Sequence, residues 1–179
     1  LGFMVRTITR NIDWKNEDNL WIATGKTSPS DPKTHNNLGD VYGRQGNLQK
    51  AAEEFSKAIE LNPNYADAYH NLGNVYQRVG SPAAALELYS KAYEINPSLW
   101  QSLQQIAFIH FQNKEFETAV NLMKQAIEIS PANPSLYVNL GIMYSELGDG
   151  ERARESYTKA LQLDPGNEIA TQALSELSL

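Results

Sequence analysis

The sequence predicts an all-α fold of stacked antiparallel helix pairs, and three observations point to it. A twelve-residue phrase recurs at residues 35–46, 69–80 and 137–148, so its starts lie one period of 34 residues and then two periods apart. Within the phrase, apolar residues recur at spacings of three and four, which places them on one helical face. Self-similarity at such a period is typical of solenoids built from helical units. Prolines keep the same step at Pro29, Pro63, Pro97, Pro131 and Pro165.

Residues 1–31 precede the first full repeat and have two parts. The apolar run "LGFMV" at residues 1–5 is too short to span a bilayer, which takes roughly 20 apolar residues. Because Trp21 stands in register with the aromatic residues of later repeats, we expect a helical half-repeat there, with Asp13 as its N-cap. The chain does not begin with Met, so we expect it to be part of a longer protein.

The first helix of each repeat is clearest in residues 66–99. Gly80 breaks its pattern, so we expect the helix to end just before that residue. Its expected apolar face is formed by Tyr69, Leu72, Val75, Tyr76 and Val79.

The second helix of the same repeat is expected to begin at Pro82, because proline is favoured at the first helical position. It should end before Pro97, which biases its predecessor away from helix. We expect Gly73 of the first helix to face Ala85 and Ala92 of the second, so that the two helices approach closely.

These residues resemble the tetratricopeptide repeat (TPR), whose pattern is aromatic-x2-Leu-Gly-x2-Tyr, then Ala-x3-Phe-x2-Ala and a closing Pro. The third repeat departs from this pattern in its first helix, at Leu103, Ile106, Ala107 and His110. The resemblance implies a right-handed superhelix of stacked antiparallel helix pairs that binds a protein segment in its concave groove. It divides the chain into repeats at 32–65, 66–99, 100–133 and 134–167, and a capping helix at 168–179.

Composition excludes several classes of function. A net charge of −6 argues against general affinity for nucleic acid, and against direct membrane binding by the repeats, because both need a basic face. The chain has no cysteine, which excludes disulfides, zinc–thiolate sites and thiol catalysis.

The sequence predicts no catalytic site, no metal site and no cofactor. His35 and His70 lie one repeat apart with no carboxylate at helical spacing, so we expect polar groups on the groove wall and not a ligand set. His110 replaces the repeat tyrosine, so we expect it to be packed and hydrogen-bonded in the core. Glu53 and Glu54 are expected on the outward, solvated face of a second helix. Phosphate-binding glycine loops and Ser-His-Asp sets are absent from the sequence.

The resemblance implies that each first helix lines the groove with a fixed set of positions. From these we select as peptide-binding candidates Asn36, Asn37, Asp40, His70, Asn71, Asn74, Gln101, Gln105, Phe108, Phe111, Asn139 and Ile142.

Four of these candidates recur in register and form a column of side-chain amides. An amide both donates and accepts, so it can pair with the backbone of any peptide. The column is similar to the asparagine ladder in the superhelical TPR region of O-linked N-acetylglucosamine transferase. The alternative is that these amides bond to neighbouring helices or water. The column consists of Asn37, Asn71, Gln105 and Asn139.

The wall is expected to be apolar toward its C-terminal half, which favours a ligand with one polar and one apolar end. The residues concerned are Phe108, Phe111, Val138 and Ile142. The alternative is that the two phenylalanines pack inside. The carboxylate clamp of chaperone-binding TPR domains is not expected, because Asp40 would repel a carboxylate and only Asn71 of the five clamp positions matches.

The segment "TITRNIDWKNEDNLW" (residues 7–21) resembles the stretch that follows the last membrane span in transmembrane TPR-containing glycosyltransferases and related bacterial polytopic membrane proteins. This resemblance implies a soluble C-terminal region exposed outside the cytoplasm, with residues 1–5 as the last turn of a membrane helix. Two alternatives stay open. One is an independent cytoplasmic adaptor, and the other is a module that self-associates through residues 1–5 or an array end.

Overall fold

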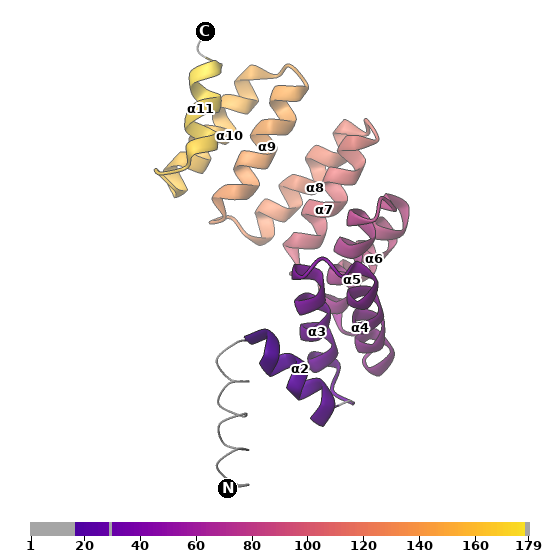
Figure 1. The fold of residues 1–179 in the computed structure, drawn as a ribbon. Coiled ribbons are helices and arrows are strands. Elements are labelled where there is room, and N and C mark those ends of the chain that lie inside the picture. The colour runs from indigo at the N-terminus through magenta and orange to yellow at the C-terminus, as the bar shows by residue number, and fades with distance from the viewer. Residues whose placement is uncertain (1–16, 29, 178–179) are drawn as a thin grey trace, which may run out of the picture. The chain divides into compact units, whose positions relative to one another are not determined.

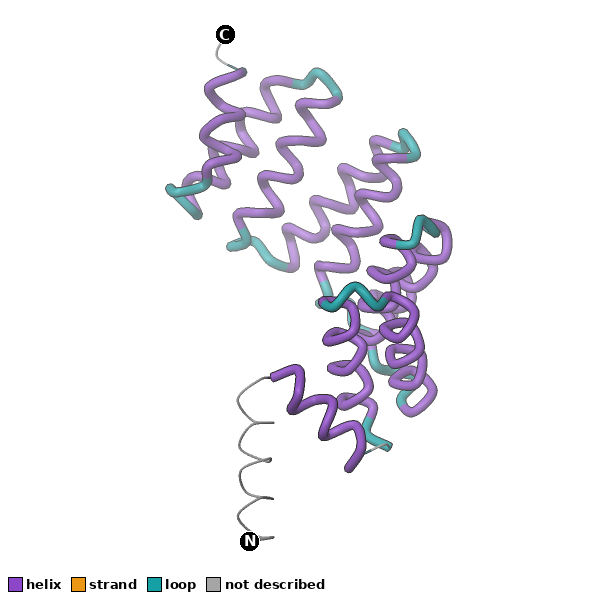
Figure 2. The backbone as a smooth tube through the Cα atoms, in the orientation of Figure 1, coloured by secondary structure: helices purple, strands orange, loops and turns teal. Residues whose placement is uncertain are grey.

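The computed structural model describes residues 17–28 and 30–177, and these residues form ten helices and no strand (Figures 1 and 2). The expected all-α fold class is confirmed. The apolar run at residues 1–5, the expected N-cap Asp13 and Pro29 lie outside the described residues.

The chain divides after Ile95 into two compact units. In the N-terminal unit α3 pairs with α4 and α5 with α6, while α2 packs on α3. Its helices are α2 (Glu17–Thr27), α3 (Pro32–Arg44), α4 (Leu48–Leu61), α5 (Ala66–Arg78) and α6 (Pro82–Ile95).

The C-terminal unit repeats this plan. Helix α7 pairs with α8 and α9 with α10, and α11 packs on α10 at the end of the array. Its helices are α7 (Trp100–Gln112), α8 (Phe116–Ile129), α9 (Pro134–Glu146), α10 (Gly150–Leu163) and α11 (Glu168–Glu176).

Side chains just before the helices satisfy the free N–H groups of the first turn. The Asn47 side chain accepts from the backbone N–H of Lys50 at 3.2 Å, and Asp149 accepts from that of Arg152 at 3.0 Å. Helix α6 begins at Pro82 and ends before Asn96, as the sequence predicts.

A glycine on each of three first helices leaves room for an aromatic ring on the following helix. A Cβ built on any of them would lie 2.6–2.7 Å from the nearest ring carbon. Gly73 was expected to face Ala85 and Ala92, and the atoms nearest to its Cβ position belong to Tyr89, which lies between these two buried alanines on the same face of α6. In the described residues these pairs are Gly39 with Phe55, Gly73 with Tyr89, and Gly141 with Tyr157.

The pair α7–α8 replaces both partners of this contact. Ala107 stands at the register of the glycine and Met123 at that of the ring, and both are fully buried. Methionine is unbranched and flexible, so it can give way to a methyl group where a planar ring cannot. The methyl group that Ala107 adds is therefore matched by the flexible side chain of Met123 in place of a ring.

The expected apolar face of α5 is only partly buried. Leu72 and Val75 belong to the core, whereas Tyr76 is 37% and Val79 is 53% exposed. Val79 lies beyond the last helical residue, and Tyr76 lies in the last turn. Neighbouring helices therefore bury these two side chains less than those in the middle of α5.

The turn inside each pair contains one residue with left-handed backbone. This residue is Gly46, Gly80 and Gly148 in three pairs, with φ of +78°, +78° and +73°. In the α7–α8 turn it is Lys114, with φ of +65°. A residue with a Cβ is strained in this region by roughly 1–2 kcal/mol.

Replacing Lys114 by Gly should therefore raise the free energy of unfolding by about 1 kcal/mol, because glycine adopts positive φ without strain. Thermal and urea unfolding followed by circular dichroism would measure the change. The matched variant Lys114→Ala removes the same side chain but keeps the Cβ, so it should bring no gain. Equal stability of the Gly and Ala variants would contradict the backbone explanation.

Candidate functional site

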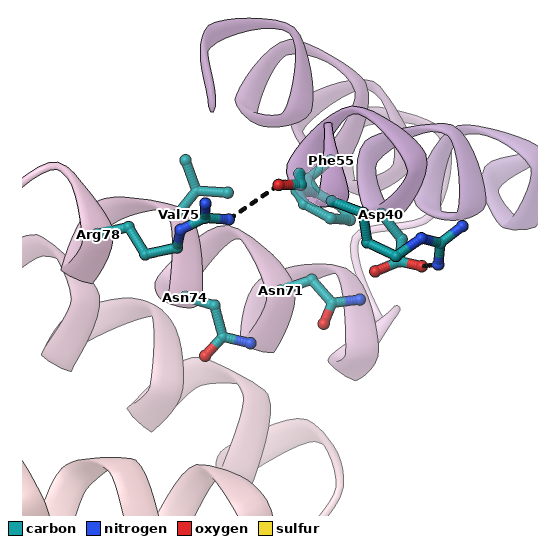
Figure 3. A pocket seen from close by; sticks show the side chains of 8 residues that line it. Asp40, Phe55, Asn71, Asn74, Val75 and Arg78 are labelled. Atoms are coloured by element: carbon teal, nitrogen blue, oxygen red, sulfur yellow. Dashed lines mark hydrogen bonds and ion pairs between the residues drawn. The ribbon is translucent and has the colours of Figure 1, made fainter. Parts of the chain in front are cut away.

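A pocket of about 200 Å³ opens between α3, α4 and α5 in the N-terminal unit (Figure 3). Three of the predicted groove residues, Asp40, Asn71 and Asn74, line it. Gly43, Phe55 and Val75 were not among the peptide-binding candidates, and Val75 was expected on the apolar packing face. The full lining is Asp40, Gly43, Arg44, Phe55, Asn71, Asn74, Val75 and Arg78.

Helix α5 supplies one wall of this pocket. Asn71, Asn74, Val75 and Arg78 follow each other at helical spacings of three and four, so they project from one face. Figure 3 shows the two asparagines and Arg78 along this helix, with Asp40 across from them. The spacing of Val75 from Asn71 is the signal that could have identified it.

The amides of neighbouring first helices contact each other. Nδ2 of Asn71 donates to Oδ1 of Asn36 at 3.1 Å, which links α5 to α3. Nδ2 of Asn37 is buried and has no hydrogen-bond partner among the residues that the structure describes. Of the two members of the predicted column in this unit, Asn71 thus donates a hydrogen bond to a neighbouring helix, whereas the amide nitrogen of Asn37 donates none.

Two arginines stand at the rim of the pocket. Nη2 of Arg44 lies 2.6 Å from Oδ1 of Asp18, and its Nη1 pairs with Asp40. The hydrogen bond from Arg44 lowers the pKa of Asp18 against a smaller opposing effect of desolvation. Nη1 of Arg78 donates to the backbone oxygen of Gly43 at 3.0 Å, which holds its guanidinium across the pocket.

His70 and Asn74 are both tied to the buried ring of Tyr89. The rings of His70 and Tyr89 lie 5.4 Å apart between centroids. Burial lowers the pKa of His70, although the nearby Asp67 opposes this, so the imidazole is neutral at pH 7. The hydroxyl of Tyr89 lies 2.8 Å from Oδ1 of Asn74 and from Oε1 of Gln77, and donates to one at a time.

His35 has a carboxylate partner that the sequence analysis placed elsewhere. Its Nδ1 lies 2.6 Å from Oε2 of Glu54, which also accepts from Lys57 at 3.0 Å. Burial raises the pKa of Glu54, but the hydrogen bonds from His35 and Lys57 outweigh it and lower the pKa overall. The expectation that Glu54 lies on a solvated outward face is wrong, since it faces the buried histidine of the preceding helix.

The remaining candidates belong to the C-terminal unit. Gln101, Gln105 and Phe108 are half-buried on α7. On α9, Asn139 is half-buried and Ile142 is exposed.

Phe111 contacts the first residue of α8. Its ring packs edge-on against that of Phe116, with centroids 5.1 Å apart. This contact ties the end of α7 to the start of α8.

The described residues were also searched for membrane-spanning helices and for metal sites. Over residues 17–28 and 30–177, no helix is both long and apolar enough to cross a bilayer. In that same part of the chain, no three histidine or acidic side chains gather as a metal site would require.

Protein O-mannosyl-transferases are similar to part of this chain in sequence. Protein O-mannosyl-transferase Tmtc2 of Drosophila melanogaster is 38% identical over 63 residues, which are 35% of this chain and 6% of that protein. Protein O-mannosyl-transferase tmtc2 of Xenopus laevis is 35% identical over 63 residues, 35% of this chain and 7% of that protein. The matches span less than a tenth of either relative.

Solved structures share the fold over most of the chain. A crystal structure of MamA superposes with a TM-score of 0.72 at 22% identity, over 88% of this chain and 92% of that chain. The pilF protein of Pseudomonas aeruginosa gives 0.75 at 25% identity, over 82% and 67%. The APC/C hetero-tetramer Cut9-Hcn1 gives 0.80 at 14% identity, over 93% and 34%.

Two family models, both described as "Tetratricopeptide repeat", match residues 30–98 and 110–177. Together they cover about three-quarters of the chain. Because these matches agree with the helix pairs and with the solved structures, the chain belongs to the tetratricopeptide repeat family and is a protein-interaction scaffold.

Proposed function

We propose that the first helices bind an extended segment of a partner protein mainly through its backbone, and that the chain itself carries out no catalysis. The observation that carries this proposal is the buried Nδ2 of Asn37, which lacks an acceptor among the described residues. A buried donor without a partner costs roughly 1–3 kcal/mol. A rotation of the Asn37 side chain toward the solvent would let a peptide carbonyl lying along α3 accept this hydrogen bond and recover that free energy.

The neighbouring amides support the same mode of binding. Asn71 uses Nδ2 to bond Asn36 but keeps its own carbonyl oxygen as an acceptor. Oδ1 of Asn74 receives the Tyr89 hydroxyl, and its NH₂ group can donate. Donors and acceptors of both kinds thus line a pocket into which a peptide backbone could be placed.

The C-terminal unit, taken by itself, offers a more apolar surface on its first helices. Gln105 and Asn139 stand at the amide positions of α7 and α9. Phe108 and exposed Ile142 lie three residues beyond them on the same helices, so they could hold apolar side chains of the ligand.

Changing Asn37, Asn71 and Asn139 together to Ala should abolish most peptide binding while the fold persists. Each lost hydrogen bond is worth roughly 0.5–1.5 kcal/mol, so a peptide selected on the native chain from a random dodecapeptide library should bind at least about tenfold more weakly. Fluorescence anisotropy measures the affinity, and circular dichroism checks that the melting temperature moves by only a few degrees.

Three exposed amides on second helices provide the matched control, because Gln49, Gln125 and Gln162 changed to Ala remove the same chemistry elsewhere. This control should bind like the native chain. Methylation of the peptide's backbone nitrogens should weaken binding more than scrambling its sequence does. Undiminished binding by the triple asparagine variant, or indifference to backbone methylation, would refute recognition through the amides.

For the wider context, we infer that the repeats form a soluble part of a polytopic membrane glycosyltransferase, exposed outside the cytoplasm, where they present protein substrates. Support comes from the partial matches to O-mannosyl-transferases and from the sequence of residues 7–21. An independent cytoplasmic adaptor is the alternative.

The intact mass and cellular location of the native gene product separate these two contexts. The membrane context predicts a membrane-integrated polypeptide much larger than the 20.0 kDa of this chain. A soluble product close to that mass would exclude it and leave the adaptor. Antibodies against the repeats, followed by mass spectrometry of the captured polypeptide, provide the measurement.

A further inference from the structure

A second and larger pocket, of about 400 Å³, lies in the C-terminal unit between α8, the end of α9 and the start of α10. None of the groove candidates of that unit lines it. Its size falls in the range of roughly 300–1,000 Å³ that is typical of ligand pockets. The residues that matter here are Phe116, Val120, Lys124, Tyr144, Leu147 and Arg152.

Four apolar or aromatic side chains are among those that line this pocket. Phe116 is 36% and Leu147 is 40% exposed, whereas Val120 and Tyr144 are buried. The edge-on contact with Phe111 fixes the ring of Phe116 beside the opening. Solvent therefore reaches apolar side chains that are already held in place, and covering them would be favourable.

Two cations flank one aromatic ring of the lining. Nζ of Lys124 lies 6.0 Å and Cζ of Arg152 lies 4.8 Å from the centroid of the Tyr144 ring. Arg152 also donates through Nε to Asp149 at 2.6 Å. Lys124 has no carboxylate partner among the described residues.

The lining is positive overall in an acidic chain. Lys124 and Arg152 face a single acidic lining residue, Glu117, whereas the whole chain carries a net charge of −6. An incoming carboxylate would meet one cation without a competing ion pair.

Repeat packing does not require these cations. Two periods earlier, serine and alanine take the places of Lys124 and Arg152, and Tyr76 is 37% exposed where Tyr144 is 4% exposed. The pair α5–α6 stacks without either cation, whereas in α3–α4 Lys50 stands at the place of Arg152 and lies 5.3 Å from the ring centroid of Tyr42. Lys124 is therefore the cation that distinguishes this pocket, because no other repeat has a cation at its place. The residues two periods earlier than the pocket residues named above are Leu48, Ala52, Ser56, Tyr76, Val79 and Ala84.

We propose that this pocket binds a segment of a partner protein in which a bulky apolar side chain stands next to a carboxylate. The apolar side chain covers Phe116 and Leu147, and the carboxylate pairs with Lys124 and Arg152. The site is separate from the groove of the first helices, so one chain can hold two protein segments at once.

The test is an NMR titration of the whole chain with an octapeptide in which Leu-Phe is flanked by Asp on both sides. The amide signals of Val120 and Leu147 should shift. A matched peptide with Asn in place of both Asp should bind about tenfold more weakly, because two ion pairs at a partly exposed site are lost. Raising the salt concentration should weaken binding of the Asp peptide.

The variant Lys124→Ser with Arg152→Ala, which introduces the residues that stand two periods earlier, should lose the preference for the Asp peptide. Changing Lys91→Ser with Lys159→Ala removes two exposed cations elsewhere and should keep it. The triple asparagine variant of the groove should also keep it. Absence of binding, equal affinity for the Asn peptide, or loss of binding in the groove variant would overturn the proposal.

Discussion

Each helix pair depends on a contact in which the first helix makes room for a bulky side chain of the second. A ring lies where a Cβ of the glycine would be, as between Gly73 and Tyr89. The contact fixes how closely the two helices approach and how they are rotated, because a planar ring fits the gap in few orientations. Tyr89 also holds two of the proposed binding residues in place, since its hydroxyl bonds to Asn74 and its ring packs on His70.

Under the proposed function, packing and recognition are divided between different positions of the same helices. The glycine and the aromatic residue pack inside the pair, whereas the proposed binding residues Asn37 and Asn71 are half-buried on the first helices. The pair α7–α8 shows how far the packing positions can vary, since Ala107 with Met123 and a left-handed Lys114 still form the same unit. Such changes leave the proposed binding positions free to differ between repeats.

Spacing along the sequence predicted the helices and their order, because the residues that form one face of a helix are close in the chain. It could not predict which side chain meets which across a pair. Glu54 was assigned to solvent, although it meets a buried histidine, and the ring that lies nearest to Gly73 was not identified. For the site, spacing indicated that amides line the first helices. It could not tell that Asn71 bonds to a neighbouring helix while Asn37 lacks a partner.

The most direct test of this account is a double-mutant cycle with Gly73→Ala and Tyr89→Met, measured by urea unfolding. Gly73→Ala alone should destabilise by roughly 1–3 kcal/mol, because its Cβ would lie 2.7 Å from the ring. Gly43→Ala, whose Cβ would lie 3.9 Å from the Cβ of Ala51, should not destabilise. The double variant should be more stable than the two single effects predict, by at least about 0.5 kcal/mol. Additive effects would contradict the account, because the glycine would then not be required by the ring.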